Sequence, residues 1–308
     1  MSSLDKKHRP KTLNAFAGNT TVIKRLKSLL ADKESFPSAL LFQGPRGCGK
    51  TSLSRIIPKK LGISEILELN IGSQRGIDHA RNLEDNVKYS SIAGGGKFII
   101  LDECHRGTVD FFNCLLKILE EPPPNVYFSL CTTNPEKLID TIKSRTKPPF
   151  IVKKLTTEEM KTLVTKIARK EKIDISGSSI MRAILTASDG IPRDALLILN
   201  SIKNIDDHET MLEFIKDGSW DEDNKEVNEL CQILLRGGTY KQTMEIVSKL
   251  DGDPDEIRRS VLNYMAKVLS GSNNPKAAII ISNFYDSFWQ VGKAGVVFAV
   301  WNCLNPTE

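Results

Sequence analysis

The stretch "QGPRGCGKTSLS" at residues 43–54 decides the fold, because its core fits the pattern G-x-x-x-x-G-K-[ST]. The apolar run "ALLF" at residues 39–42 comes before it, and a helical pattern comes after it. In such a strand–loop–helix unit, backbone N–H groups of the loop and the N-terminus of the helix converge on a phosphate group. The sequence therefore predicts a site for the phosphates of a nucleotide; a glycine-rich surface turn with a chance Lys-Thr pair is the weaker alternative.

Two side chains at the end of this loop carry the expected chemistry. Lys50 is expected to reach the β- and γ-phosphates of ATP, and the Thr51 hydroxyl is expected to ligate Mg²⁺. Gly47 and Gly49 stand where the turn needs a positive φ. The loop residues expected to bind ATP are Gly44, Pro45, Arg46, Gly47, Cys48, Gly49, Lys50, Thr51 and Ser52.

A second apolar run, in "FIILDECH" at residues 98–105, ends in two acids. Ligands of open α/β sheets collect at the carboxyl ends of the strands, which is where Asp102 is expected to lie. We expect Asp102 to hold Mg²⁺, partly through water, and Glu103 to polarise the attacking water. Adjacent acids are common in turns, but together with Lys50 and Thr51 they predict ATP hydrolysis.

Apolar runs and helical patterns alternate over the first half of the chain. Strands are expected within residues 39–42, 97–105, 125–134 and 149–155, and helices at 20–33, 76–89 and 108–121. This alternation favours an α/β fold with a parallel sheet and flanking helices. After residue 155 the patterns are helical only, so we expect an α/β domain at 1–154 and helical domains at 155–204 and 205–308.

The composition is typical of a soluble globular protein, with 40% hydrophobic and 26% charged residues in 308 positions. No run of about 18 apolar residues occurs, so no membrane span is expected. The start "MSSLDKKHRPK" lacks the apolar core of a signal peptide. The six cysteines show no C-x-x-C pair and no metal spacing, so we expect reduced thiols, a cytoplasmic protein and no zinc.

The net charge of +5 is unevenly spread. Residues 1–150 carry 23 Lys/Arg and 15 Asp/Glu, whereas residues 151–308 carry 20 and 23. A basic first half suits an anionic partner, either a nucleotide or a nucleic acid, although an ordinary solvated surface would also give this balance.

Several motifs, in order along the chain, resemble those of AAA+ clamp-loader ATPase subunits, the family of replication factor C small subunits and the tau/gamma subunit of bacterial DNA polymerase III. They are "HRPKTLNAFAGN" (8–19), "GPRGCGKTS" (44–52), "QRGIDHARNLEDNV" (74–87), "LDECH" (101–105), "LLKILEEPPPNVYFSLCTTNPEKLIDTIKSRT" (115–146) and "GIPRDALLIL" (190–199). The most specific is 115–146. The resemblance implies an AAA+ P-loop domain followed by a helical lid and, over 205–308, an all-α collar that matches in size and helicity only.

The resemblance also implies roles for single residues. Thr133 falls at sensor 1, near the γ-phosphate, and Arg145 falls at the arginine finger, which acts on ATP held by a neighbouring subunit. Arg193 falls at sensor 2, and Arg9 and Pro10 fall in the opening that lines the adenine pocket. Taken singly, Thr133 could merely cap a turn, and the two later arginines could be solvated helix charges. The expected catalytic residues are therefore Glu103, Lys50, Arg145, Thr133 and Arg193.

DNA contacts are expected at Arg75 and Arg81, around the start of the 76–89 helix, because in the family this helix start follows the phosphate backbone. Thr108, at the start of the 108–121 helix, is a weaker candidate of the same kind. The alternative is that both arginines pair with Asp78 or with the acids at 84–85, which lie within helical reach.

Four features depart from the family pattern or from a regular helix. Thr146 stands where the family has cysteine after the finger arginine, and Cys104 is a mild change in "DECH". Pro58 lies about two turns into the helix after the loop and is expected to shorten or kink it. No cysteine occurs between residues 53 and 103, so the zinc module of the bacterial relatives is missing, which is similar to a bacteriophage-type loader; an archaeal-like or viral small subunit is the alternative.

The resemblance implies an ATPase that opens a sliding clamp on binding ATP, grips primer–template DNA and releases the closed clamp on hydrolysis. The expected partners are the sliding clamp, primer–template DNA, other clamp-loader subunits in a pentamer and the DNA polymerase holoenzyme. The location would be the cytoplasm, in contact with the nucleoid, or the host cytoplasm for a phage protein. Two alternatives stay open: another AAA+ ATPase, such as a helicase loader, a recombination-associated ATPase or a remodeller, and a non-catalytic scaffold subunit.

Overall fold

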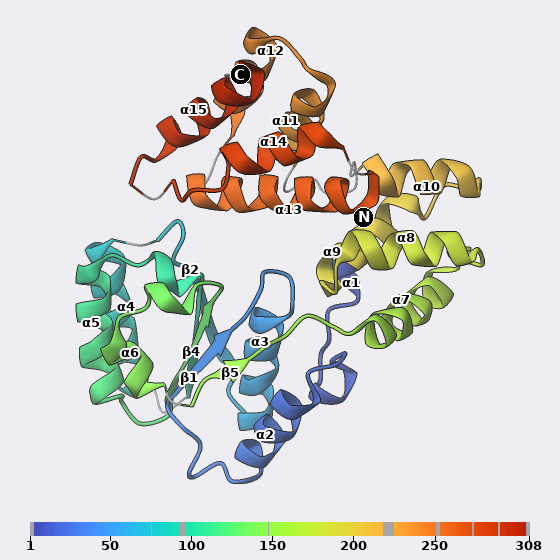
Figure 1. Ribbon diagram of the computed structural model, residues 1–308. Coiled ribbons are helices and arrows are strands. Elements are labelled where there is room, and N and C mark those ends of the chain that lie inside the picture. The colour runs from blue at the N-terminus through green and yellow to red at the C-terminus, as the bar shows by residue number, and fades with distance from the viewer. Residues whose placement is uncertain are drawn as a thin grey trace. The chain divides into compact units, whose positions relative to one another are not determined.

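The computed structural model describes residues 3–74, 76–92, 96–146, 148–217, 225–250, 253–272, 274–288 and 290–305. The chain divides into two compact units, Met1–Leu212 and Glu213–Glu308, whose elements are labelled in Figure 1. The predicted division into three domains, with boundaries at 154 and 204, is not tested by this division into two units and stays a prediction. Within the described ranges, no helix is both long and apolar enough to cross a membrane.

The first unit contains a five-stranded sheet in which every pair of neighbouring strands is parallel. Its strands are β1 (Ala39–Gln43), β2 (Glu65–Asn70), β3 (Lys97–Asp102), β4 (Val126–Thr132) and β5 (Phe150–Ile151), in the order β2-β3-β4-β1-β5. Four of the strands overlap the predicted ranges, and the α/β fold with a parallel sheet is confirmed. β2 was not predicted; it is a largely exposed strand at one edge of the sheet.

The strand order places β4 between β1 and β3. Gln43 of β1 pairs with Thr132 of β4, and Leu101 of β3 pairs with Leu130 of β4. Because the carboxyl ends of parallel strands meet at one edge, the segments that follow β1, β3 and β4 also meet there. The loop at 44–49, the acids at 102–103 and the polar residues at 132–134 are thereby brought together.

Helices cover both faces of this sheet (Figure 1). They are α2 (Thr20–Ala31) and α3 (Lys50–Leu61) on one face, and α4 (Ile77–Ile92), α5 (Val109–Glu120) and α6 (Asp140–Arg145) on the other. Successive residues of a strand point to opposite faces. Accordingly, Leu41 packs in one core cluster with Phe111 of α5, and Phe42 packs in the other with Leu53 of α3.

The helix after the loop does not stop at Pro58. α3 continues through Lys59 and Lys60 to Leu61 and ends at Gly62, whose φ of 82° closes the helix. Pro58 therefore does not end the helix, and the expected kink at Pro58 stays a prediction. A proline removes one helical hydrogen bond, but Pro58 itself is buried in α3, and packing of the helix on the sheet offsets that loss.

Three helices follow the sheet within the first unit, namely α7 (Thr157–Glu171), α8 (Ser178–Ser188) and α9 (Pro192–Ile202). A capping box between Thr156 and Glu159 begins α7. The short N-terminal helix α1 (Leu4–Lys7) packs on α9. Lys7 and His8 also contact the carboxylate of Glu171, at 2.8 and 2.5 Å. The N-terminal segment thus joins this helical group.

The second unit is helical throughout its described residues. α10 (His208–Asp217) spans the boundary between the units, and α11 (Lys225–Arg236), α12 (Tyr240–Lys249), α13 (Pro254–Ser272), α14 (Pro275–Asn283) and α15 (Lys293–Leu304) follow. These last five helices share a core that includes Leu230, Val261 and Phe284. A helical C-terminal region is confirmed.

Candidate functional site

The loop at 44–49 is held between two other segments of the first unit. Gly47 and Gly49 have φ values of 75° and 102°, which suit glycine. A Cβ atom on Gly47 would lie 2.6 Å from Ile191 Cγ2, and one on Gly49 would lie 2.6 Å from Phe16 Cζ. The segment before α9 and the N-terminal segment therefore both approach the loop backbone so closely that only glycine fits.

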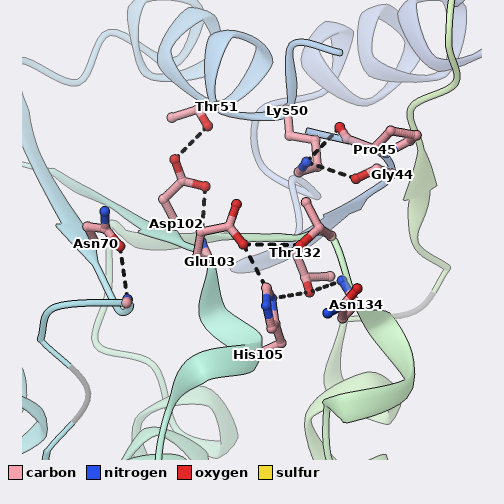
Figure 2. Close-up of polar contacts among 12 residues, drawn as sticks. Gly44, Pro45, Lys50, Thr51, Asn70, Asp102, Glu103, His105, Thr132 and Asn134 are labelled. Carbon is pink, nitrogen blue, oxygen red and sulfur yellow. Dashed lines mark hydrogen bonds and ion pairs between the residues drawn. The ribbon is translucent and has the colours of Figure 1, made fainter. Parts of the chain in front are cut away.

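Lys50 points its ammonium group back over the loop. Its Nζ donates to the carbonyl oxygens of Gly44 and Pro45, at 2.8 and 2.9 Å, as Figure 2 shows. The residue is only 5% exposed. A buried cation beside a glycine-rich loop at a helix N-terminus fits a phosphate group, because the loop amides and the ammonium are all donors.

Thr51 and Asp102 meet at the carboxyl end of β3. The Thr51 hydroxyl donates to Asp102 Oδ2 at 2.8 Å, and the backbone N–H of Glu103 donates to Oδ1 at 3.0 Å (Figure 2). Mg²⁺ binds oxygen ligands and keeps several waters, so a hydroxyl and a carboxylate fit it. No group of three His, Cys, Asp or Glu side chains suited to a metal exists among the described residues, so a cation here would take its other ligands from water and phosphate.

Glu103 follows in a left-handed conformation, with φ 50° and ψ 40°. That conformation is costly for a residue other than glycine and is typical of functional sites. The Thr133 hydroxyl donates to Glu103 Oε2 at 3.2 Å. Burial raises the pKa of the Glu103 carboxyl, and the nearby Lys50 ammonium opposes that shift. The predicted base and the predicted sensor 1 residue therefore touch each other.

The side chains of two further residues at this edge, His105 and Thr132, were not predicted to belong to the site. His105 Nδ1 lies 3.0 Å from Thr132 Oγ1 and 3.5 Å from Glu103 Oε2. The Thr132 hydroxyl oxygen also accepts from the backbone N–H of Asn134, at 3.1 Å. The available signal was the polar run at 132–134 directly after an apolar strand, together with the histidine in "LDECH".

Arg193 lies where the helical group meets the loop. Its backbone N–H donates to Gly47 O at 3.4 Å, and its Nε lies 3.9 Å from Asp5 Oδ2. The predicted sensor 2 segment thus contacts the phosphate loop directly, through α9 and the residue before it.

Arg145, at the end of α6, contacts a different part of the first unit. Its Nη2 donates to Glu120 Oε1 of α5 at 2.7 Å, and the two side chains are 44% and 48% exposed. None of its hydrogen bonds and ion pairs in the described part of the chain is with Lys50, Thr51 or Asp102. The structure therefore does not bring Arg145 to the loop of its own chain.

The remaining ATP-binding predictions fall in two places. Cys48 is buried in the loop, and burial raises the pKa of its thiol to about 11; Arg46 is exposed and Ser52 half-buried. Arg9 and Pro10 line a hollow of about 420 Å³ beside α3 and β2. The other residues lining that hollow are Lys6, Lys11, Arg55, Ile56, Lys59, Ile66 and Glu68.

The predicted DNA residues are on or near two helix starts. The Arg81 side chain is 65% exposed and lies 3.9 Å from Asp78, so the pairing alternative is present as a long surface contact. Thr108 caps α5 by accepting from Phe111 N at 3.2 Å. Arg75 lies outside the described residues.

Comparisons of sequence find similarity to subunits of DNA polymerase III. A family profile described as "DNA polymerase III, delta subunit" matches residues 63–154. DNA polymerase III subunit gamma/tau of Mycobacterium tuberculosis is 33% identical over 226 residues, covering 65% of this chain and 38% of that protein. DNA polymerase III subunit tau/gamma of Haemophilus influenzae is 30% identical over 280 residues, covering 82% and 40%. The chain therefore spans about two fifths of the length of these relatives.

Comparisons of structure agree on the fold. A RuvB structure from Thermotoga maritima matches with a TM-score of 0.56 and 21% identity, over 89% of this chain and 85% of the other. Another, described as a Holliday junction branch migration motor, matches with a TM-score of 0.53 at 21% identity, over 89% and 84%. At this identity the likeness shows the AAA+ P-loop fold alone. Fold and relatives together confirm the predicted resemblance: the chain has the AAA+ P-loop fold and is similar in sequence to DNA polymerase III gamma/tau subunits.

Proposed function

We propose that the chain is an ATPase subunit of a sliding-clamp loader. The observation that carries the proposal is the arrangement at the sheet edge, where Lys50, Thr51, Asp102, Glu103 and Thr133 converge. Each has the side chain that phosphoryl transfer requires: a cation for phosphate, oxygens for the metal, and a carboxylate and a hydroxyl near an attacking water. The gamma/tau relatives support the choice of a clamp loader among AAA+ proteins.

In this proposal each residue has one task. Lys50 and the loop amides bind the β- and γ-phosphates, and Thr51 and Asp102 hold Mg²⁺. Bound Mg²⁺ would neutralise charge that develops on the phosphate oxygens. Glu103 orients and polarises water, and Thr133 keeps the Glu103 carboxylate in place. Arg193 couples the helical lid to the nucleotide, while Arg9 and Pro10 face the adenine from the N-terminal segment.

Two tasks require other molecules. Arg145 completes the ATP site of a neighbouring subunit, which requires an assembly of several clamp-loader subunits, and we propose a pentamer. Arg75, Arg81 and Thr108 follow the phosphate backbone of primer–template DNA, and the sliding clamp and polymerase holoenzyme are the further partners. Such a role is carried out at DNA in the cytoplasm. The bacteriophage type stays a prediction, as does the timing in which ATP binding opens the clamp and hydrolysis releases it.

The test is the steady-state ATPase rate of the assembled protein with neither, either or both of sliding clamp and primed DNA. A clamp loader is stimulated synergistically by both, and Lys50→Ala abolishes the activity because it removes the cation that follows the phosphates. Stimulation by DNA alone would favour the helicase-loader or recombination alternatives. No ATPase activity at all, in the presence of both partners, would leave the non-catalytic scaffold. The RuvB likeness does not favour a recombination role, since it concerns the fold alone.

A further inference from the structure

His105 occupies a buried position between two of the strand ends that form the candidate site. It lies in a short 3-10 helix, Cys104–Arg106, directly after Glu103. Its side chain is only 2% exposed. The ring nitrogen Nδ1 faces both Thr132 Oγ1, at 3.0 Å, and Glu103 Oε2, at 3.5 Å (Figure 2). A polar group buried this deeply is costly unless it is hydrogen-bonded.

The surroundings select which nitrogen of His105 carries a proton. A bare Nδ1 would turn a lone pair toward the Glu103 carboxylate, which is unfavourable at 3.5 Å. A protonated Nδ1 instead donates to Thr132 Oγ1 and presents a positive edge to Glu103. The Thr132 oxygen can accept both this proton and the one from Asn134 N, which lies 3.1 Å away, because a hydroxyl oxygen has two lone pairs.

Two donors therefore address the same carboxylate oxygen. Thr133 Oγ1 donates to Glu103 Oε2 at 3.2 Å, and His105 Nδ1 lies 3.5 Å from that atom. Both contacts fall on Oε2, so they fix one end of the carboxylate and direct the other oxygen, Oε1, away from the two donors. With Oε2 fixed from two sides, Oε1 is the atom left to meet a water.

We propose that His105 is a positioning residue that holds the Glu103 carboxylate at a fixed place relative to the end of β4. The inference rests on the proposed ATPase function and extends it to a residue outside the groups proposed to hold the nucleotide and the metal. Thr132, Thr133, His105 and Glu103 then form one connected unit, so that Glu103 keeps its place relative to the strand that carries Thr133. Removing the His105 ring misplaces the base and leaves nucleotide binding intact.

Three replacements of His105 separate positioning from packing. His105→Asn puts an amide N–H close to where Nδ1 stands, His105→Gln puts one close to where Nε2 stands, and His105→Leu fills the space without a donor. Displacing a reacting group by about 1 Å can cost about 100-fold in rate. We therefore expect kcat for ATP to fall about 10- to 100-fold in His105→Leu and His105→Gln, and His105→Asn to stay within about 3-fold of wild type.

The accompanying measurements guard against a folding defect. KM for ATP and the affinity for a fluorescent ATP analogue should change by less than about 2-fold in all three variants, since each variant keeps the residues that are proposed to bind ATP. In a Glu103→Gln background, His105→Leu should have no further effect on kcat, because the group that it positions is gone. An equal loss in all three variants, or no loss in any, overturns the proposal.

A readout without nucleotide completes the test. Nitrogen-15 NMR of the histidine rings should show a protonated Nδ1 for His105, assigned by the signal that disappears in His105→Asn. A ring protonated at Nε2 only would contradict the proposed contact. The two failures are distinguishable: if wild type lacks ATPase activity with clamp and DNA, the proposed function fails, whereas an active wild type with an active His105→Leu variant overturns the positioning role alone.

Discussion

Charged side chains are buried at the edge of the sheet that carries the loop at 44–49, and they are exposed at the corner of the first unit formed by Arg145 and Glu120. At the loop edge, Lys50 is 5% exposed and bonded to its own loop, and the hydroxyl–carboxylate contacts around it close within the chain. At the corner, Arg145 and Glu120 are each nearly half exposed and touch across two helices. An exposed pair of this kind contributes about 0.2–1 kcal/mol. The residues at the loop edge contact one another within the chain and form the inward half of the proposed chemistry. Arg145, in a weak ion pair at the surface, is the outward half.

The largest expected effect breaks the outward half. Arg145→Ala should fold, bind ATP and lose hydrolysis in the assembly by about 10³–10⁵-fold, the range of an arginine finger. Lys143→Ala is the matched control, because Lys143 lies on the same short helix and pairs with Asp140 instead. The ATPase rates of assembled variants check this prediction.

A mixing experiment shows whether Arg145 acts on a neighbouring chain. Arg145→Ala subunits retain the loop but lack the finger, and Lys50→Ala subunits retain the finger but lack the loop cation. Mixed assemblies should regain part of the activity. Absence of rescue at every ratio would mean that Arg145 acts within its own chain or has no part in hydrolysis.

The next effect breaks the inward half. Glu103→Gln should leave ATP binding intact and lower turnover by about 10²–10⁴-fold, because it removes the group that polarises the water. Clamp and DNA should then stay bound in the complex, which gel filtration with labelled DNA measures. Normal hydrolysis by Glu103→Gln would mean that another residue is the base.

A smaller effect is expected from a change at the contact between the loop and the helical group. Gly47→Ala should weaken nucleotide affinity about 10-fold or more, since its Cβ would lie 2.6 Å from Ile191 and push α9 away from the loop. Gly62→Ala is the control: Gly62 has a similar φ of 82° but no atom within 4 Å of a built Cβ. It should lose about 1–3 kcal/mol of stability from backbone strain and keep its nucleotide affinity. Titration calorimetry measures the nucleotide affinity, and thermal unfolding measures the stability. Equal nucleotide affinities in the two variants would mean that the contact of Gly47 with Ile191 does not affect nucleotide binding.

The smallest effect concerns the arginines at the start of α4. The double change Arg75→Ala/Arg81→Ala should lower DNA-stimulated ATPase activity and leave the basal rate nearly unchanged. The slope of log K against log salt should decrease by about 0.9 for each DNA phosphate that the protein no longer neutralises. Arg169→Ala, an exposed arginine on α7, serves as the control. Full stimulation with an unchanged slope would remove both arginines from the DNA path.

What could be read from the sequence follows the strength of local signals. β1, β3 and β4 are apolar runs buried on both faces of the sheet, and the loop between β1 and α3 has a fixed spacing of glycines. β2 has the sequence "EILELN", in which acids interrupt the apolar residues, and it is largely exposed, so the run lacks a buried strand's composition. The short helix α6 likewise has few turns in which a periodic pattern could appear.

The candidate site was predictable where residues neighbour each other in sequence and not where the sheet brings them together. Lys50 and Asp102 belong to recognisable motifs. The contact of His105 with Thr132 depends on the pairing of Leu101 with Leu130 and so on the register of β3 with β4. That register is set by packing of the whole sheet. The pairing of Arg145 with Glu120, which are 25 positions apart, depends in the same way on how α6 packs against α5.

The burial of Cys48 supplies the chain with a built-in chemical reporter. Burial raises the pKa of this thiol to about 11, so little of it is ionised at neutral pH, and the thiolate is the form that reacts with alkylating reagents. Alkylation of Cys48 is therefore expected to require that its side chain leave the core cluster in which it is buried, against which Phe16 and Ile191 pack. The rate at which mass spectrometry finds Cys48 alkylated thus reports how often the loop opens, and it requires no engineered cysteine.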